Sequence, residues 1–284
     1  MTQTIDPFMI RAHVPEFEAH LAAYRRASER TRQTLRGVRD LAYGDHPDEK
    51  LDLYLPPGGD GPFPVHVFVH GGYWRAFSKL DFAFVADAVT AHGAIAAIID
   101  YSLMPKARMA TLVGQVRRAV AWLTDHAGRW GGDPAAISAS GASAGAHLAS
   151  FLMCRGAMEA AAPGLSVRSL LLVSGIYDLR PITSSFLQPE IGLTEEEVAA
   201  WSPLAAAPVP GPAVHVVAGA AETAPFLEQG RAFADRLREA GVAASFATLP
   251  GEDHMSIATA LGTPGTDLAA RLGRTIATSR RPAG

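Results

Sequence analysis

The stretch Gly141-Ala142-Ser143-Ala144-Gly145 lies between a segment with strand character, residues 136–140, and a segment with helix character, residues 146–152. Gly-x-Ser-x-Gly in that position is typical of a nucleophile elbow, a tight, strained turn that projects a serine Oγ at the carboxyl edge of a sheet. The following helix N-terminus offers free N–H groups and partial positive charge to a developing oxyanion. The alternative is a tight strand–helix turn without chemistry, because small-residue runs also arise by chance.

The alternation of apolar segments around this elbow predicts an α/β fold. Strand patterns occupy residues 38–43, 50–55, 65–69, 94–99, 136–140, 170–173, 214–217 and 243–249. Helical spacing marks residues 15–36, 82–89, 109–123, 226–237 and 264–277. We expect a mostly parallel eight-stranded sheet with helices on both faces, opened by an antiparallel hairpin. The alternation in residues 51–55 indicates a strand with one exposed face.

Composition narrows the class of protein. The 284 residues carry a net charge of −3, which argues against a nucleic-acid partner. The one cysteine, Cys154, allows no intrachain disulfide and is expected as a small buried hydrophobe. Because neither a signal-peptide core nor a membrane-length apolar run is found, we expect a soluble, cytoplasmic protein without a membrane partner. The oligomeric state stays open, with a homodimer among the options.

The hydrophobic content of 48% can fill one core, so residues 1–284 are interpreted as a single domain. Residues 1–14 look irregular and precede the first helix. Residues 180–212 break the strand–helix alternation and are rich in Pro, Ser and Glu, with a short helical piece near 194–200. We expect this segment to be an insertion over the active site, where substrate specificity would lie.

The sequence His70-Gly71-Gly72-Tyr73-Trp74 directly follows the predicted strand 65–69. Acyl transfer needs N–H donors aimed at the tetrahedral oxyanion. Adjacent glycines let the backbone turn its N–H groups toward a pocket, so the amides of Gly72, Tyr73 and Ala144 are the expected oxyanion hole. His70 is expected to fix this loop by a hydrogen bond. Tyr73 and Trp74 are predicted pocket walls, with ordinary packing as the alternative.

A base must reach Ser143 from a late loop. His254 follows the last predicted strand, and the chain order serine, acid, histidine is that of a hydrolase triad. Glu222, after the strand 214–217, is the expected acid, and Asp178, after the preceding strand, is the alternative. No pair of histidines has the spacing of a metal site on an open loop, so zinc-dependent hydrolysis, and with it a metal, is not expected.

Together these segments resemble the kynurenine formamidase (arylformamidase) branch of the α/β-hydrolases, near the hormone-sensitive-lipase-like esterases. The tryptophan after His-Gly-Gly-Tyr is the discriminating detail, since lipase-like relatives usually carry a third glycine where Tyr73 stands. The resemblance spans residues 38–280, and residues 1–37 look like the family's N-terminal helical lid. One departure from the family pattern concerns the acid, which is expected to be a glutamate, Glu222, whereas aspartate is usual in this fold. The carrying segments are residues 70–74, 141–148 and 174–179 and the loops of Glu222 and His254.

The resemblance implies a cofactor-free serine hydrolase that acts on a small-molecule ester or amide. An aryl formamide, N-formylkynurenine above all, is the implied substrate, with the substrate-binding residues Tyr73, Trp74, Ile176 and Tyr177 around it. A general small-acyl carboxylesterase is the close alternative. A non-catalytic hydrolase-fold binding protein is the third, and an intact set of serine, histidine, acid and oxyanion loop argues against it.

Overall fold

The computed structural model describes residues 5–59 and 61–280; residues 1–4, 60 and 281–284 of the predicted domain lie outside the described residues. The strands are β1 (Gly37–Ala42), β2 (Lys50–Tyr54), β3 (Phe63–Val69), β4 (Ile95–Ile99), β5 (Gly132–Ala142), β6 (Cys154–Arg155), β7 (Val167–Val173), β8 (Ala207–Pro208), β9 (Ala213–Gly219) and β10 (Ala244–Leu249). The α-helices are α1 (Ile10–His13), α2 (Phe17–Thr34), α3 (Val85–Ala91), α4 (Met109–His126), α5 (Ala144–Ser150), α6 (Gln188–Ile191), α7 (Glu195–Trp201), α8 (Ala224–Glu239), α9 (Ser256–Gly262) and α10 (Asp267–Ser279). Two short 3-10 helices are η1 (Ala127–Trp130) and η2 (Arg180–Ser184).

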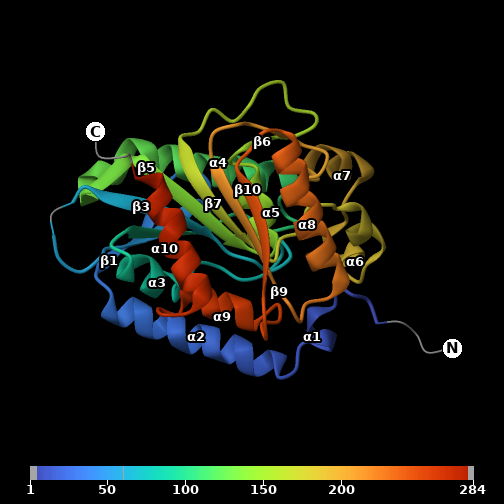
Figure 1. Cartoon of the computed structure of the whole chain (residues 1–284), viewed down its shortest axis with the longest axis horizontal. Helices are drawn as coiled ribbons and strands as arrows, with labels where there is room; N and C mark the ends of the chain where they lie inside the picture. Colours follow the sequence, from blue (N-terminus) through green and yellow to red (C-terminus); the bar gives the residue numbers. More distant parts are fainter. Residues whose placement is uncertain (1–4, 60, 281–284) are drawn as a thin grey trace.

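One eight-stranded sheet organises the described residues, in the order β1-β2-β4-β3-β5-β7-β9-β10. Strand β2 pairs antiparallel with both β1 and β4, and every pairing from β4 across to β10 is parallel. Helix α10 crosses in front of the sheet and α4 lies behind it in Figure 1. The mostly parallel eight-stranded sheet with helices on both faces is therefore confirmed. No helix in this part of the chain is both long and apolar enough to cross a membrane.

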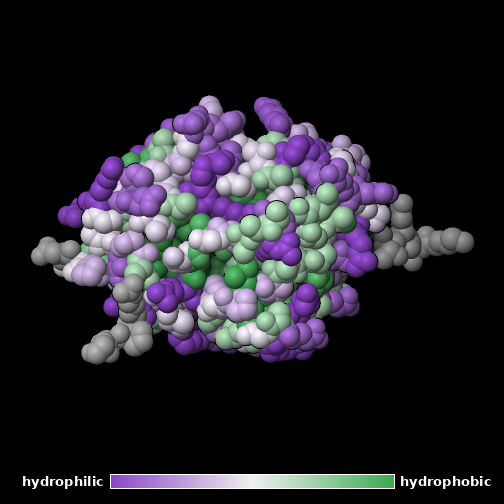
Figure 2. Space-filling view, turned by 90° about the horizontal axis from the view of Figure 1, so that it is seen from above, coloured by the Kyte–Doolittle hydropathy of each residue, from purple (hydrophilic) through white to green (hydrophobic). Residues whose placement is uncertain are grey.

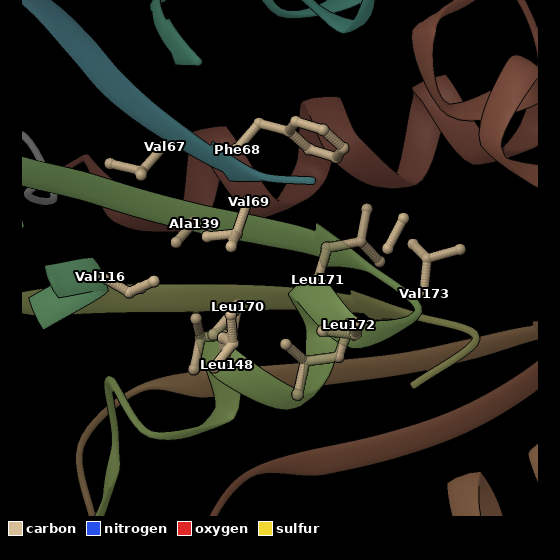
Figure 3. Close-up of a cluster of buried hydrophobic side chains, with 14 of the residues drawn as sticks. Val67, Phe68, Val69, Val116, Ala139, Leu148, Leu170, Leu171, Leu172 and Val173 are labelled. Carbon is tan, nitrogen blue, oxygen red and sulfur yellow. The ribbon is translucent and has the colours of Figure 1, made fainter. Parts of the chain in front are cut away.

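The core follows from strands that are covered on both faces. Strands β3, β4 and β7 are near-continuous apolar runs, as expected where helices pack on each side of a parallel sheet. Figure 3 shows Val67 and Val69 of β3 near Ala139 of β5, with Val116 of α4 and Leu148 of α5 beside the β7 leucines. On the face seen from above, hydrophobic residues gather near the middle and hydrophilic ones toward the rim (Figure 2). The packed core holds the carboxyl ends of the parallel strands at one edge, where the loops described below converge.

The prediction that β2 has one exposed face is wrong. Leu51, Asp52, Leu53 and Tyr54 are all buried. Asp52 tolerates burial because the Lys79 Nζ lies 2.9 Å from its Oδ1, and the same ammonium lies 2.7 Å from Asp40 Oδ1. A charged residue that alternates with apolar ones is predicted to be exposed. The local sequence does not show that a lysine from a distant part of the chain will pair with it.

Lys79→Met should therefore lower the free energy of unfolding by about 3–5 kcal/mol, because it leaves the buried Asp52 carboxylate with only the Arg39 guanidinium, 3.9 Å away, as a counter-charge. Urea unfolding followed by circular dichroism measures the change. Lys106→Met, at an exposed lysine, is the matched control and should shift stability by less than about 0.5 kcal/mol. Equal stabilities of the two variants would show that this buried pair is not needed.

Three local expectations differ from the structure. Helix α1 lies in the N-terminal stretch expected to be irregular, and at four residues it is too short to show periodicity. Helix α9 follows the last strand and was not predicted. Residues 132–134 belong to β5, which therefore begins before the predicted strand 136–140, because the chain turns at Gly131, whose φ is 76°. The helical piece expected near 194–200 is α7, which the Thr194 side chain caps.

Candidate active site

Ser143 occupies the turn between β5 and α5, with φ 55° and ψ −121°. Both glycines of the motif are required by close backbone contacts. A Cβ on Gly145 would lie 2.0 Å from the Val69 carbonyl oxygen, and one on Gly141 would lie 2.3 Å from the Gly145 carbonyl oxygen. The strained serine and the two close approaches are the geometry of a nucleophile elbow.

Three side chains from separate loops form one hydrogen-bonded chain. His254 Nε2 lies 3.0 Å from Ser143 Oγ, and His254 Nδ1 lies 2.6 Å from Glu222 Oε2. Because a carboxylate only accepts, the imidazole donates from Nδ1 and keeps Nε2 free to accept the serine proton. The histidine side chain is 8% exposed and the glutamate side chain is fully buried. This arrangement can transfer a proton from the serine to the histidine.

The other oxygen of Glu222 is also held. Its Oε1 accepts from Ser174 Oγ at 2.5 Å and from the Gly219 amide at 2.6 Å. The sequence assigned no role to Ser174, which lies in the segment 174–179 that carries the family resemblance. The position of Ser174 directly after β7 could have indicated this role, because side chains at that point lie at the catalytic edge of the sheet. Glu222 is thereby fixed in orientation before any substrate arrives.

The alternative acid, Asp178, lies elsewhere. Its carboxylate binds the exposed Arg180 guanidinium, with Nη2 2.7 Å from Oδ2. Burial opposes ionisation of Asp178, but its hydrogen bonds and charge pairing with Arg180 hold its pKa below the usual range. The structure thus places Glu222, and not Asp178, beside His254.

The oxyanion loop, residues 70–74, turns through an unusual backbone path. Gly72, Tyr73 and Trp74 all have positive φ, of 110°, 49° and 59°. Among residues 5–59 and 61–280, the amides of Gly72, Tyr73 and Ala144 donate to no protein acceptor. Backbone amides are strong donors, so these three are available to a ligand oxygen.

Hydrogen bonds of His70 hold the oxyanion loop in place. Its Nδ1 donates to the Gly71 carbonyl oxygen at 2.8 Å, and Tyr101 donates its phenol to the His70 carbonyl oxygen at 2.8 Å. The two rings stack with centroids 4.3 Å apart. Burial lowers the pKa of His70 to about 4, so the ring is neutral at pH 7. The expected loop-fixing hydrogen bond is present.

A pocket of about 500 Å³ opens over Ser143 and His254. Tyr73 lines it, donates its phenol to the Phe8 carbonyl oxygen at 2.6 Å and packs edge-on against Phe186. Phe186 comes from the segment 180–212. The N-terminal segment supplies a further wall, comprising Met9, Ile10, Arg11, Phe17, Leu21 and Tyr24. The sequence predicted a lid over residues 1–37 but placed none of these side chains at the pocket, because nothing local shows which distant loop a helix face will cover.

The N-terminal segment is tied to the loops that carry the acid and the base. Thr223, next to Glu222, donates its hydroxyl to the Pro7 carbonyl oxygen at 2.8 Å. Tyr24 donates its phenol to the carbonyl oxygen of Met255, next to His254, at 2.5 Å. We call these two bonds, together with Tyr73 to Phe8, the N-terminal clasp. The pocket is therefore closed by hydrogen bonds as well as by apolar contact.

Three of the four predicted substrate-binding side chains do not line this pocket. Trp74 is fully buried and donates from Nε1 to His147 Nδ1 at 3.1 Å. Tyr177 is fully buried and stacks on Phe233, and Ile176 is 1% exposed. The Trp74 indole packs edge-on against His147 of α5, so it lies away from the cavity. Only Tyr73 has the position that was expected of it.

Comparison with known proteins gives consistent results. A family model described as BD-FAE matches residues 51–186. A kynurenine formamidase from Danio rerio is 32% identical over 244 residues, covering 84% of this chain and 82% of the relative. An isoprenylcysteine alpha-carbonyl methylesterase from Arabidopsis thaliana is 28% identical over 241 residues, covering 77% of this chain and 56% of the relative.

Among solved structures, a proposed thioesterase from Silicibacter sp. TM1040 superposes with a TM-score of 0.80 at 26% identity. The match covers 94% of this chain and 97% of that one. These likenesses confirm the α/β-hydrolase fold and the hydrolase class of the enzyme. The sheet order, the serine elbow and the 32% sequence identity to the Danio rerio enzyme show that the chain belongs to the kynurenine formamidase family of α/β-hydrolases.

Proposed function

We propose that the protein is a serine hydrolase of the arylformamidase type, which removes a formyl or other small acyl group from an aromatic amine. The observation that carries the proposal is the hydrogen-bonded chain of Ser143, His254 and Glu222 at the pocket. The 32% sequence identity to a kynurenine formamidase makes N-formylkynurenine the first substrate to test. The aromatic walls formed by Tyr73, Phe77 and Phe186 suit an aryl group.

In the proposed mechanism, Ser143 Oγ attacks the formyl carbon while His254 Nε2 takes its proton. Glu222 stabilises the imidazolium, and the amides of Gly72, Tyr73 and Ala144 hold the oxyanion. The C–N bond then breaks, and His254 returns the proton to the leaving amine. Water next attacks the formyl-serine with His254 as base, which releases formate and restores the free serine.

A small-acyl carboxylesterase is the second candidate, and the 28% sequence identity to a methylesterase favours it. The two candidates differ in the leaving group, since an ester loses an alcohol and a formamide loses an amine. Comparing kcat/KM for N-formylkynurenine and p-nitrophenyl acetate separates them. Turnover of the ester alone would favour the carboxylesterase. Failure of a fluorophosphonate probe to label the protein would instead point to a non-catalytic binding protein.

Acyl length provides a further prediction. Tyr73 is held between Phe8 and Phe186, and this wall should leave little room beyond a short acyl group. We expect kcat/KM for p-nitrophenyl acetate to exceed that for the octanoate by about tenfold, the scale set by a few misplaced methylenes. A series from acetate to octanoate measures this. A steady rise with chain length would contradict the prediction and indicate a lipase-like acyl site.

A further inference from the structure

The charged side chains that line the pocket are unbalanced. Two arginines, Arg11 and Arg75, contribute to its wall, and among the described lining residues there is no aspartate or glutamate. The remaining lining is mainly apolar or aromatic. A positive wall stands out on a chain whose net charge is −3. Low-dielectric surroundings strengthen the attraction of such a charge for an anion.

Arg75 is the arginine closer in sequence to the reacting groups. Its amide and that of Ala76 both donate to the Gly72 carbonyl oxygen at 3.0 Å, so the chain folds back onto the oxyanion loop at this point. Burial and the negative charges of Asp6 and Glu222 raise the pKa of Tyr73. The positive charge of Arg75 opposes that rise, so it too acts at this wall of the pocket. Ser143 and Arg75 line the same pocket, so a substrate whose carbonyl lies at Ser143 can extend toward this guanidinium.

The donors of Arg75 are only partly used. Its Nη1 pairs with Glu190 Oε2 at 2.6 Å, but the Glu190 side chain is 47% exposed. Its buried Nε has no acceptor among the described residues. Arg11 differs, because its side chain is 69% exposed and pairs with the similarly exposed Glu18. Glu190 occupies only Nη1 of Arg75, so the sheltered Nε is left for a substrate anion to accept from.

We infer that Arg75 binds a carboxylate of the substrate, so that the enzyme selects formamides or esters whose leaving group carries a negative charge. This inference rests on the proposed hydrolase function and adds the charge of the substrate to it. A planar guanidinium suits this role because it meets a carboxylate with two parallel N–H donors.

Two matched substrate pairs test the inference. Formanilide and 4-formamidobenzoate differ by one carboxylate on a formamide, and phenyl acetate and 4-acetoxybenzoate differ in the same way on an ester. The measured quantity is the ratio of kcat/KM for the anionic member to that for the neutral member. Comparing this ratio between variants cancels the intrinsic reactivity of each substrate. It also cancels general damage to the oxyanion loop, which would lower both rates together.

Arg75→Gln should lower the ratio by about 10- to 100-fold, the range expected for a lost charge-assisted hydrogen bond. Arg75→Lys should give an intermediate ratio, because it keeps the charge and loses the planar fork. Arg129→Gln removes the same charge from an exposed site outside the pocket lining and should leave the ratio unchanged. Added KCl should lower the ratio of the original protein and have little effect on that of Arg75→Gln.

An unchanged ratio in Arg75→Gln, or an equal fall in Arg129→Gln, would overturn the inference. Failure of the proposed formamidase function gives a different result, in which neither formamide is hydrolysed and both esters are. In that event the ester pair still decides whether Arg75 recognises the carboxylate.

Discussion

Ser143→Ala should reduce kcat by about a million-fold for every ester and amide substrate, because the proposed mechanism then has no nucleophile. Binding and the oxyanion donors would remain, so a small rate above that in water should persist. The fold should be retained, since alanine differs from serine only by the hydroxyl and adds no bulk at the elbow. Steady-state kinetics with circular dichroism on the same samples measures both effects.

Labelling with a fluorophosphonate provides an independent readout of the same variant. The original protein should gain one adduct by mass spectrometry, and Ser143→Ala should gain none. Ser184→Ala, at an exposed serine, is the matched control and should behave like the original protein. Near-normal turnover by Ser143→Ala would show that the reaction occurs at another site.

Glu222→Gln should reduce kcat by about 10⁴ with little change in KM. The amide keeps the shape of the carboxylate but lacks its charge, so it no longer stabilises the imidazolium. Its NH₂ group can also donate to His254 Nδ1, which places the ring proton on Nε2, where it blocks acceptance from Ser143. Comparing kcat and KM for one substrate across the two proteins measures the effect.

Asp178→Asn is the control for that experiment, because Asp178 is the other acid at the same edge of the sheet. It binds Arg180 in the structure, so its replacement should act on stability and leave kcat within about threefold. An inactive Asp178→Asn beside an active Glu222→Gln would reverse the assignment of the acid.

Local patterns predicted the parts of this molecule that local rules govern. Strands β3, β4 and β7 could be predicted because buried parallel strands are largely apolar, and the elbow because its glycines are required by close backbone contacts. The choice between Glu222 and Asp178 could not be made by spacing, since β7 and β9 are neighbours and both end at the catalytic edge. The geometry distinguishes them by placing Ser174 and Gly219 around the glutamate.

The errors share a physical cause, which is dependence on partners distant in sequence. Trp74 lies at the oxyanion loop, where a pocket wall is a reasonable expectation, yet its indole is buried against His147, 73 residues away in the sequence. Asp52 alternates with leucines, yet Lys79 makes its burial tolerable. The direction of a side chain and the arrival of a counter-ion are set by the assembled fold and leave no periodic signal.

The N-terminal clasp has a consequence for the newly synthesised chain. Tyr24 leaves the ribosome long before the acceptor of its phenol, the Met255 carbonyl, which is made 231 residues later. Pro7 and Thr223 are separated by 216 residues. A nascent chain can therefore contain the elbow serine long before its pocket is closed. Closing these long loops costs entropy that only late contacts repay, so hydrolytic activity should appear only once synthesis has passed His254.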